Sequence, residues 1–420
     1  MRRTHPDRGH RTRPGEDHGP VRYGPPPPGH GLPPLPALVT ALTDAARSQD
    51  ERPTALLRAA AGYYARRGLG TDAGLLAAAP GLPPLLVAVT AVLGGDVLVP
   101  RPCGAWWAPQ ARALGRSVFH VATAAESGGV PDPYALLETV RRVRDEGGDP
   151  RLLVLSVADD PTAAVAPPEA VHEVVEAAVG EGLHLVSDET WRDTVHRPHE
   201  TVLVSPAEMA PDRVTVVTDL AGPFLLAGWP AAVARFPATA DGAALHARVL
   251  DVLSALGARV ADPVAAAAAY ALAEPADVTE RLTASVRLHA RVAAAAYETV
   301  VRAGVTARFP RAGRHLYVDL GPLRPAPAAR GVGDAQELED LLTARLGLPV
   351  PGGHRFGDDL EALRVRLSTA PLLGATDEEH QESLSSLSPV ELPHVQRALM
   401  NLGSVFDDLR DDAQRWEPPR

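Results

Sequence analysis

The sequence predicts an α/β protein with a large, mostly parallel sheet flanked by helices and a smaller α/β domain after it. Short β-branched runs alternate with helical stretches up to Val217, and the helices lengthen beyond Phe236. Two further strand-like runs, HLYVDL and LRVRLS, follow towards the C-terminus. Such alternation is typical of a parallel sheet with helices on both faces, which binds ligands at the carboxyl ends of its strands.

The predicted elements follow one another in a regular order. Apolar residues at helical spacing predict helices in ALVTALTDAAR, TALLRAAAGYYARRG and LPPLLVAVTAVL, and Gly94-Gly95 ends the last of them. β-branched runs predict strands in DVLVP, SVFHV, LLVLSV, LHLVS and VTVVT, with helices such as PYALLETVRRVRDEG and PEAVHEVVEAAVGEG between them. An amphipathic helix near residues 392–409 is expected to pack on the body of the protein rather than to bind a partner.

The chain of 420 residues is too long for one small core. Residues 1–35 are rich in Pro, Gly, Arg and His, which predicts a disordered N-terminal arm. Residues 36–270 are expected to form the large domain, with N-terminal helices of the small domain at its start. Residues 271–420 are expected to form the small domain and a C-terminal helix.

Charge and cysteine usage exclude several classes of protein. With 41 basic and 52 acidic residues the net charge is −11, which argues against nucleic-acid and membrane-surface binding. No run approaches the roughly 20 apolar residues that a membrane span needs. The single cysteine, Cys103, fits a reducing compartment, and we expect a cytoplasmic protein.

All 41 basic residues are arginine, so the chain contains no lysine. A genome biased toward Arg, Ala, Gly and Pro codons explains why surface lysines are missing. Such a bias does not easily delete a lysine that chemistry requires.

From about Tyr23 to Ala370, the order of motifs resembles the class I/II aminotransferases, which are fold-type I pyridoxal-phosphate enzymes. YGPPPP resembles the N-terminal arm of the histidinol-phosphate aminotransferase branch, and GGDVLVPRP resembles the family's GD-x-V-x-x-P-x-P turn. LVLSVADDPTAAV stands at the N-P-x-N-P-T-G loop, LVSDETW at the D-E-x-Y strand end and RVRLSTA at the R-L-S segment. The order and spacing of these motifs over some 350 residues, counted between those ends, carry the resemblance.

The resemblance implies that the catalytic lysine is absent. In TDLAGPFLLAGWP, alignment on Gly228 puts Ala221 and Gly222 at the family's serine and lysine places and Pro230 at its arginine place. The family's lysine forms an imine with the cofactor aldehyde, which requires a primary amine. We therefore predict no catalytic residue, with Gly222 at the lysine position.

Other walls of the implied cofactor pocket have also changed. Gly81-Leu82-Pro83 replaces a glycine followed by small polar phosphate donors, and Gly104 stands where a ring stacks on the pyridine, although Trp106 or Trp107 is a possible substitute. Asp160 replaces an asparagine, and Trp191 a tyrosine, that donate to the phenolate oxygen of the cofactor. The cofactor is therefore not expected to bind in the family's manner.

Two groups of the family pattern remain, and each has a structural alternative. Asp188 stands at the carboxylate that pairs with the pyridinium nitrogen, but it is also placed to cap the next turn. Arg366 stands at the guanidinium that binds a substrate carboxylate, but an ion pair between domains has the same appearance in sequence. Tyr23 resembles an arm residue that crosses a dimer contact. The tryptophans 106, 107 and 191 are also explained by packing alone.

No metal site or thiol nucleophile is expected. His196, His315 and His354 lack metal-ligand spacing, and Cys103 has no evident base nearby. The histidines of the N-terminal arm are irregularly spaced as well.

The sequence leaves three hypotheses about function. The first is a non-transaminating pseudoenzyme that has no cofactor and binds a small carboxylate around Arg366 or acts as an assembly partner. The second is an enzyme that holds pyridoxamine phosphate or pyridoxal phosphate non-covalently, with Asp188 at the ring. The third is a heteromer with an active paralogue, in place of the homodimer that the family resemblance implies.

Overall fold

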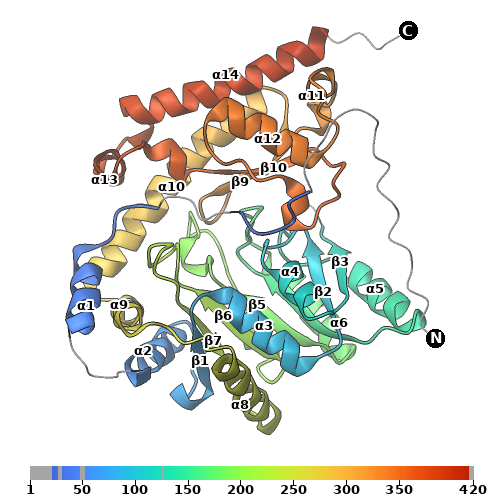
Figure 1. Cartoon of the computed structure of the whole chain (residues 1–420), viewed down its shortest axis with the longest axis vertical. Coiled ribbons are helices and arrows are strands. Elements are labelled where there is room, and N and C mark those ends of the chain that lie inside the picture. The colour runs from blue at the N-terminus through green and yellow to red at the C-terminus, as the bar shows by residue number, and fades with distance from the viewer. Residues whose placement is uncertain (1–20, 27–30, 48–52, 125–126, 416–420) are drawn as a thin grey trace.

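A computed structural model describes residues 21–26, 31–47, 53–124 and 127–415 of the chain (Figure 1). Most of the predicted N-terminal arm, residues 1–20 and 27–30, lies outside the described residues. Two sheets are present, one of seven strands and one of three, each covered by helices.

The large sheet has the strand order β1-β7-β6-β5-β4-β2-β3. Strands β2 to β6 pair in parallel, whereas β7 runs antiparallel to both of its neighbours, β1 and β6. The strands of this sheet are β1 Leu76–Ala79, β2 Asp96–Arg101, β3 Val118–Ala122, β4 Pro150–Ser156, β5 His184–Asp188, β6 Val214–Asp219 and β7 Ala232–Arg235.

Strand register brings the carboxyl ends of the central strands to one edge of the sheet. Ser156 pairs with Asp188, and Asp188 pairs with Val217 two residues before the end of β6. Because β7 is antiparallel to both β1 and β6, β1 runs in the same direction as β6 and also ends at this edge. Helix α3, which begins at Leu82 just after β1, therefore starts beside the ends of β4, β5 and β6.

Helices cover both faces of the large sheet, and apolar side chains fill the space between the layers (Figure 1). One core contains residues of the helices α2, α5, α6 and α9, and another contains residues of α3, α4 and α8. The helices that precede the second sheet are α1 Pro36–Arg47, α2 Pro53–Arg66, α3 Leu82–Leu93, α4 Trp107–Ala113, α5 Pro133–Asp145, α6 Pro168–Gly180, α7 Pro206–Met209, α8 Ala240–Ala255, α9 Asp262–Ala273 and α10 Ala276–Arg302.

The second sheet has the strand order β10-β9-β8 and is entirely antiparallel. The long helix α10 leads from the large sheet to this smaller part, and α14 lies across its far side (Figure 1). Its elements are β8 Thr306–Ala307, β9 His315–Asp319, α11 Pro325–Ala329, α12 Ala335–Leu346, β10 Arg364–Ser368, α13 Asp377–Ser385 and α14 Pro393–Arg415. Leu402 and Phe406 of α14 are buried in a third core, with residues of α10 and α12.

The α/β class and the mostly parallel sheet are confirmed. Strands β1 and β7 and the two-residue β8 are not among the strands that β-branched runs predicted. The C-terminal helix was expected near residues 392–409 and extends to Arg415. In the described part of the chain, none of the helices has the length and apolar character needed to cross a bilayer.

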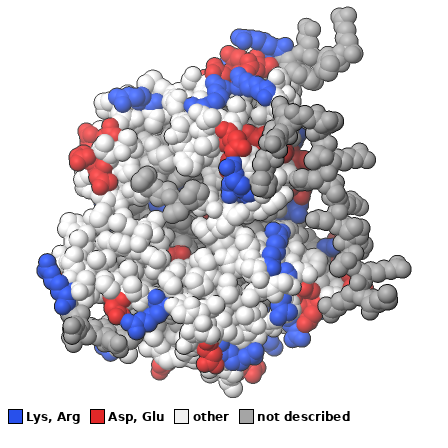
Figure 2. Space-filling model, in the orientation of Figure 1, with Lys and Arg blue, Asp and Glu red and all other residues white. Residues whose placement is uncertain are grey.

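Acidic and basic side chains are interspersed on the face of the molecule shown in Figure 2. A largely uncharged band crosses the middle of this face, between the two parts of the fold. The carboxyl edge of the large sheet lies beneath the smaller sheet. A ligand site is expected at this edge in a fold of this kind.

Candidate functional site

A pocket with about 430 Å³ of empty space lies at the carboxyl edge of the large sheet. Four of the six residues proposed from sequence as cofactor or ligand contacts line it, namely Asp188, Asp160, Trp191 and Trp106. The other lining residues are Leu82, Gly104, Trp107, Ser156, Thr190, Asp219 and Ala221.

The carboxylate of Asp219, from the end of β6, lies at the N-terminus of helix α3. This carboxylate accepts a hydrogen bond from the backbone N–H of Leu82 at 3.1 Å and another from that of Ala221 at 2.9 Å. No side chain of the helix's own start caps it, and Gly81, the residue before the helix, has φ +95°. A helix N-terminus attracts anions because its free N–H groups and dipole carry partial positive charge. Here the anion belongs to the chain itself.

Arg366, on β10, forms an ion pair with Asp160. Its Nη1 donates to the two carboxylate oxygens at 2.7 and 2.8 Å, and both side chains are largely buried. Burial alone would raise the pKa of Asp160, but the charge and hydrogen bond of Arg366, together with smaller contributions from its other basic neighbours, lower this pKa below its usual value. Asp160 is therefore ionised at neutral pH. The guanidinium also lies over the ring of Phe356, 4.8 Å from its centroid.

His315 contacts the same carboxylate, with its Nδ1 3.3 Å from Oδ1 of Asp160. Burial and the charge of Arg366 lower the pKa of His315 well below its usual value, so the imidazole is neutral at pH 7. Its ring meets the ring of Trp191 edge to face at a centroid distance of 5.5 Å. Asp160 thus has two partners from the smaller sheet.

Gly222, at the place that the resemblance assigns to the lysine, lies next to a guanidinium. A Cβ atom at this position would be 3.3 Å from Nη2 of Arg314 and 3.3 Å from Cη2 of Trp191. Gly222 has φ +120°, which side-chain-bearing residues rarely adopt. Arg314 lies over the ring of Trp191, 5.3 Å from its centroid. The backbone and both neighbours therefore suit glycine here.

Three acidic side chains of the strand ends have raised pKa values. Burial raises the pKa of Asp188 and of Asp219 to about 6, and that of Asp159 to about 7. Asp188 accepts a hydrogen bond from the N–H of Thr190 at 3.0 Å, as the capping alternative predicts, and it also lines the pocket. Asp159 accepts from the hydroxyl of Thr162 at 2.5 Å.

The aromatic wall of the pocket comes from Trp107 as well as Trp106 and Trp191. A Cβ at Gly104 would lie 3.1 Å from the indole nitrogen of Trp107, so this ring lies against the glycine. Trp107 is buried and also belongs to the core beneath the sheet, which agrees with a packing role.

Tyr23 and Cys103 lie apart from this pocket. The ring of Tyr23 is half exposed and meets His354 edge to face at 5.7 Å. Cys103 is buried, and burial raises the pKa of its thiol well above the usual range.

Sequence reasoning missed three residues of the site, namely Asp219, His315 and Arg314. A signal for Asp219 was present, since an acidic residue directly follows the β-branched run that ends β6. Arg314 precedes strand β9 of the other sheet, and His315 begins it. Only the tertiary fold brings His315 to Asp160 and Arg314 to Gly222.

Comparison with known proteins agrees with this architecture. A family model described as aminotransferase class I and II matches residues 45–384. An aspartate/prephenate aminotransferase of Thermus thermophilus is 33% identical over 136 residues, 32% of this chain and 33% of that protein. A probable aspartate/prephenate aminotransferase of Thermus aquaticus is 32% identical over the same shares. The matched stretch thus spans about a third of the length of these curated relatives.

Solved aminotransferase structures share the fold over most of the chain. An aspartate aminotransferase from Thermus thermophilus with maleate superposes with a TM-score of 0.69 at 22% identity, covering 86% of this chain and 88% of that one. An aromatic aminotransferase from Pyrococcus horikoshii gives a TM-score of 0.71 at 18% identity, covering 92% and 95%. The family model, which matches most of the chain, establishes membership. This chain belongs to the aminotransferase class I and II family.

Proposed function

We propose that this chain uses the aminotransferase fold without catalysing pyridoxal-phosphate-dependent transamination. A chain without lysine offers no side-chain amine for an imine with the cofactor aldehyde, and guanidinium does not replace it. Its role is then to bind a small ligand or to assemble with another chain.

The observation that carries the proposal is that two of the chain's own carboxylates occupy positions suited to anions. Asp219 accepts from the N–H of Leu82 at the start of α3, and Asp160 is bonded to Arg366. A cofactor phosphate at α3 would meet a carboxylate in its place. A substrate carboxylate at Arg366 would compete with Asp160. Pyridoxal phosphate, which the family implies, therefore does not fit these residues in the usual way.

The small carboxylate ligand predicted around Arg366 would meet a guanidinium that is already bonded to Asp160. An internal ion pair with both partners largely buried already satisfies part of that guanidinium. A ligand there has to displace Asp160, which would leave a buried carboxylate beside His315. Asp188 remains in the pocket, which leaves the alternative of a non-covalently held pyridoxamine phosphate open to the same test.

The test is titration of the purified full-length protein with pyridoxal phosphate and, separately, with pyridoxamine phosphate. We expect no visible absorbance band of a bound aldehyde and, after borohydride treatment, no pyridoxyl mass on the body of the chain. Peptide mapping separates such an adduct from one on the terminal amine. A lysine-bearing aminotransferase treated in parallel is the positive control. Product formation that depends on either compound contradicts the proposal.

We further propose that the protein is a homodimer, as the family resemblance implies. Light scattering after size exclusion is expected to give twice the chain mass of 44.2 kDa. A monomeric mass refutes this assembly, and a stable complex recovered with a lysine-bearing paralogue supports the heteromer instead.

A further inference from the structure

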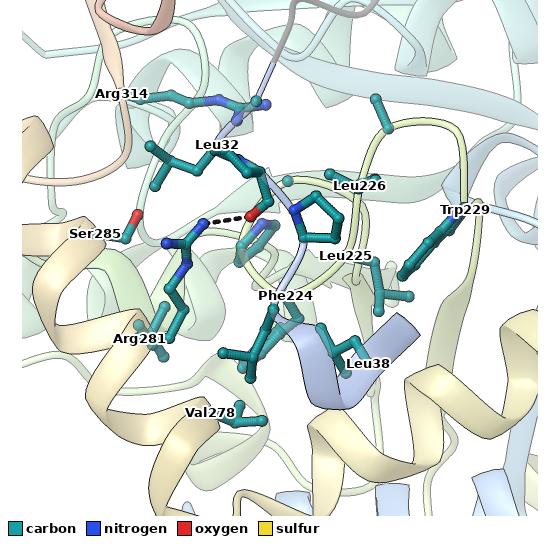
Figure 3. Close-up of a pocket in the computed structure, with 18 of the residues that line it drawn as sticks. Leu32, Leu38, Phe224, Leu225, Leu226, Trp229, Val278, Arg281, Ser285 and Arg314 are labelled. Atoms are coloured by element: carbon teal, nitrogen blue, oxygen red, sulfur yellow. Dashed lines mark hydrogen bonds between the residues drawn. The ribbon is translucent and has the colours of Figure 1, made fainter. Parts of the chain in front are cut away.

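A second cavity lies on the other side of the loop that follows β6. It contains about 750 Å³ of empty space, part of which is open to solvent. The two cavities meet this loop at adjacent residues, since Ala221 lines the first and Gly222 lines the second. Its remaining walls come from the segment before α1, from helix α10 and from Arg314 (Figure 3).

Most of the wall is apolar. Phe224, Leu225 and Trp229 of the loop lie opposite Val278 of α10, and Leu38 of α1 closes the lower side (Figure 3). A lining of this kind is typical of small-molecule sites, in which a few polar groups orient a mostly apolar ligand.

Helix α10 contributes three polar side chains to this wall. Arg281, Ser285 and His289 are spaced four residues apart, so they lie on the same face of the helix. One guanidinium nitrogen of Arg281 donates to the carbonyl of Pro33, as the dashed line in Figure 3 marks. His289 is bonded to Thr369, and burial lowers its pKa to about 3, so it carries no charge at pH 7.

Arg314 brings a second guanidinium to the cavity, from the loop before β9 (Figure 3). Burial and the like charge of Arg366 lower its pKa to about 10, so it stays protonated at pH 7. Its contact with the ring of Trp191 is a cation–π contact and not an ion pair.

Neither guanidinium has a carboxylate partner among the described residues, and none of the lining residues is acidic. Two cations in a largely apolar, partly desolvated cavity are costly unless an anion accompanies them. Arginine offers five N–H donors, and among the described residues the hydrogen bond to Pro33 uses one of those of Arg281.

We propose that this cavity binds a small organic acid, with its carboxylate at Arg281 and Arg314 and its apolar body against Phe224, Leu225 and Trp229. Ser285 lies between the two arginines along the wall and is placed to donate to the same carboxylate (Figure 3). The site is separate from the pocket at Asp188 and does not depend on whether that pocket holds a cofactor.

The experiment is calorimetric titration of the full-length protein with phenylacetate and octanoate, each beside its neutral amide. The expected result is binding of at least one acid with a Kd of about 1 mM or tighter, and weaker or no binding of its amide. Arg314→Gln and Arg281→Gln are each expected to weaken that acid at least tenfold. Arg287→Gln, an exposed arginine on the same helix, is the matched control and is expected to leave affinity unchanged.

Thermal unfolding distinguishes loss of the site from loss of the fold. Because none of the described carboxylates lies within ion-pair distance of Arg314, Arg314→Gln is expected largely to retain the Tm of the unliganded protein while losing the Tm increase that the acid produces. Equal binding of acid and amide, unchanged affinity in both arginine variants, or no binding by either acid overturns the proposal. None of these outcomes bears on the cofactor titration, so the two proposals fail separately.

Discussion

Asp160 and Asp219 line the same pocket, yet their pKa values move in opposite directions. Asp160 has the guanidinium of Arg366 within 2.8 Å, whereas Asp219 has only backbone N–H groups. At Asp160 the charge and hydrogen bond of Arg366, together with its other basic neighbours, outweigh desolvation, whereas at Asp219 two neutral donors do not. The two residues therefore respond differently to substitution and to pH.

Asp160→Asn is expected to destabilise the fold by about 3 kcal/mol at pH 7, because Arg366 loses its counter-charge while it stays buried. Urea unfolding measures this loss. Formate is expected to raise the Tm of the variant more than that of the native protein, since a free carboxylate then takes the vacated place. The double variant Asp160→Asn/Arg366→Gln is the control and is expected to be more stable than Asp160→Asn alone. A cost below about 0.5 kcal/mol, typical of exposed pairs, contradicts the assignment.

Asp219→Asn is expected to change the pH dependence of stability. The pKa of Asp219 in the folded state is about 6, above the value of about 3.9 in an unfolded chain. Its proton thus stabilises the native protein fully below pH 4, and this contribution is lost as the pH rises through 6. Relative to the native protein, the variant should gain about 2–3 kcal/mol of unfolding free energy between pH 4 and pH 7. Subtracting the two pH series cancels the contribution of the buried histidines. Asp212→Asn, at an exposed aspartate, is the control variant, and a difference for Asp219→Asn that does not change with pH refutes the raised pKa.

At the scale of elements, one arginine joins three separate segments of the chain. Arg67, just after α2, is bonded to Asp193 beyond β5 and to Glu274 at the end of α9. Tyr63 donates to the same Asp193 at 2.7 Å, and the guanidinium lies 3.5 Å from the centre of its ring. Glu274 has φ +53°, an uncommon value that these contacts hold in place.

Arg67→Ala is expected to cost about 3 kcal/mol of unfolding free energy, because it removes the guanidinium that two largely buried carboxylates share. Arg66→Ala is the matched control. This neighbouring arginine also pairs with Glu274 but is 45% exposed, and its loss should cost about 1 kcal/mol or less. Chemical denaturation of both variants tests the comparison, and equal losses argue against the proposed network.

The elements themselves were predictable because the information is local. Helical spacing predicted α5 and α6, and β-branched runs predicted β4, β5 and β6. Strand β7 has the sequence AVAR, which carries little strand signal, and it forms because β1 and β6 offer it two edges. The ion pair of Asp160 with Arg366 spans 206 positions and joins two sheets, so no local pattern indicates it.

Across the whole molecule, the features that distinguish the site come from four separate segments. Asp219 ends β6 and Gly222 follows it, Asp160 follows β4, Arg314 precedes β9, and Leu82 at the start of α3 donates to Asp219. The family resemblance placed Gly222 and Asp160 from sequence. It did not reveal that the chain's own side chains occupy the space around them, because such contacts arise only when the two sheets meet.

Restoring the lysine alone should therefore not restore an imine. In Gly222→Lys, the new Cβ would lie 3.3 Å from both Arg314 and Trp191, at a φ of +120° that a side chain disfavours. We expect a loss of roughly 1–3 kcal/mol in stability from the backbone alone. Asp219 also remains at the start of α3 and acts against binding of the cofactor phosphate, and the guanidinium of Arg314 still lies beside the added side chain. Spectroscopic titration with pyridoxal phosphate, followed by borohydride and peptide mapping, is expected to find no adduct at position 222.

Gly228→Lys, in the same loop with open space around its Cβ, controls for adventitious modification of any added amine. A stoichiometric adduct at position 222 but not at 228 would mean that the lysine was the only missing part, and that Asp219 and Arg314 do not exclude the cofactor.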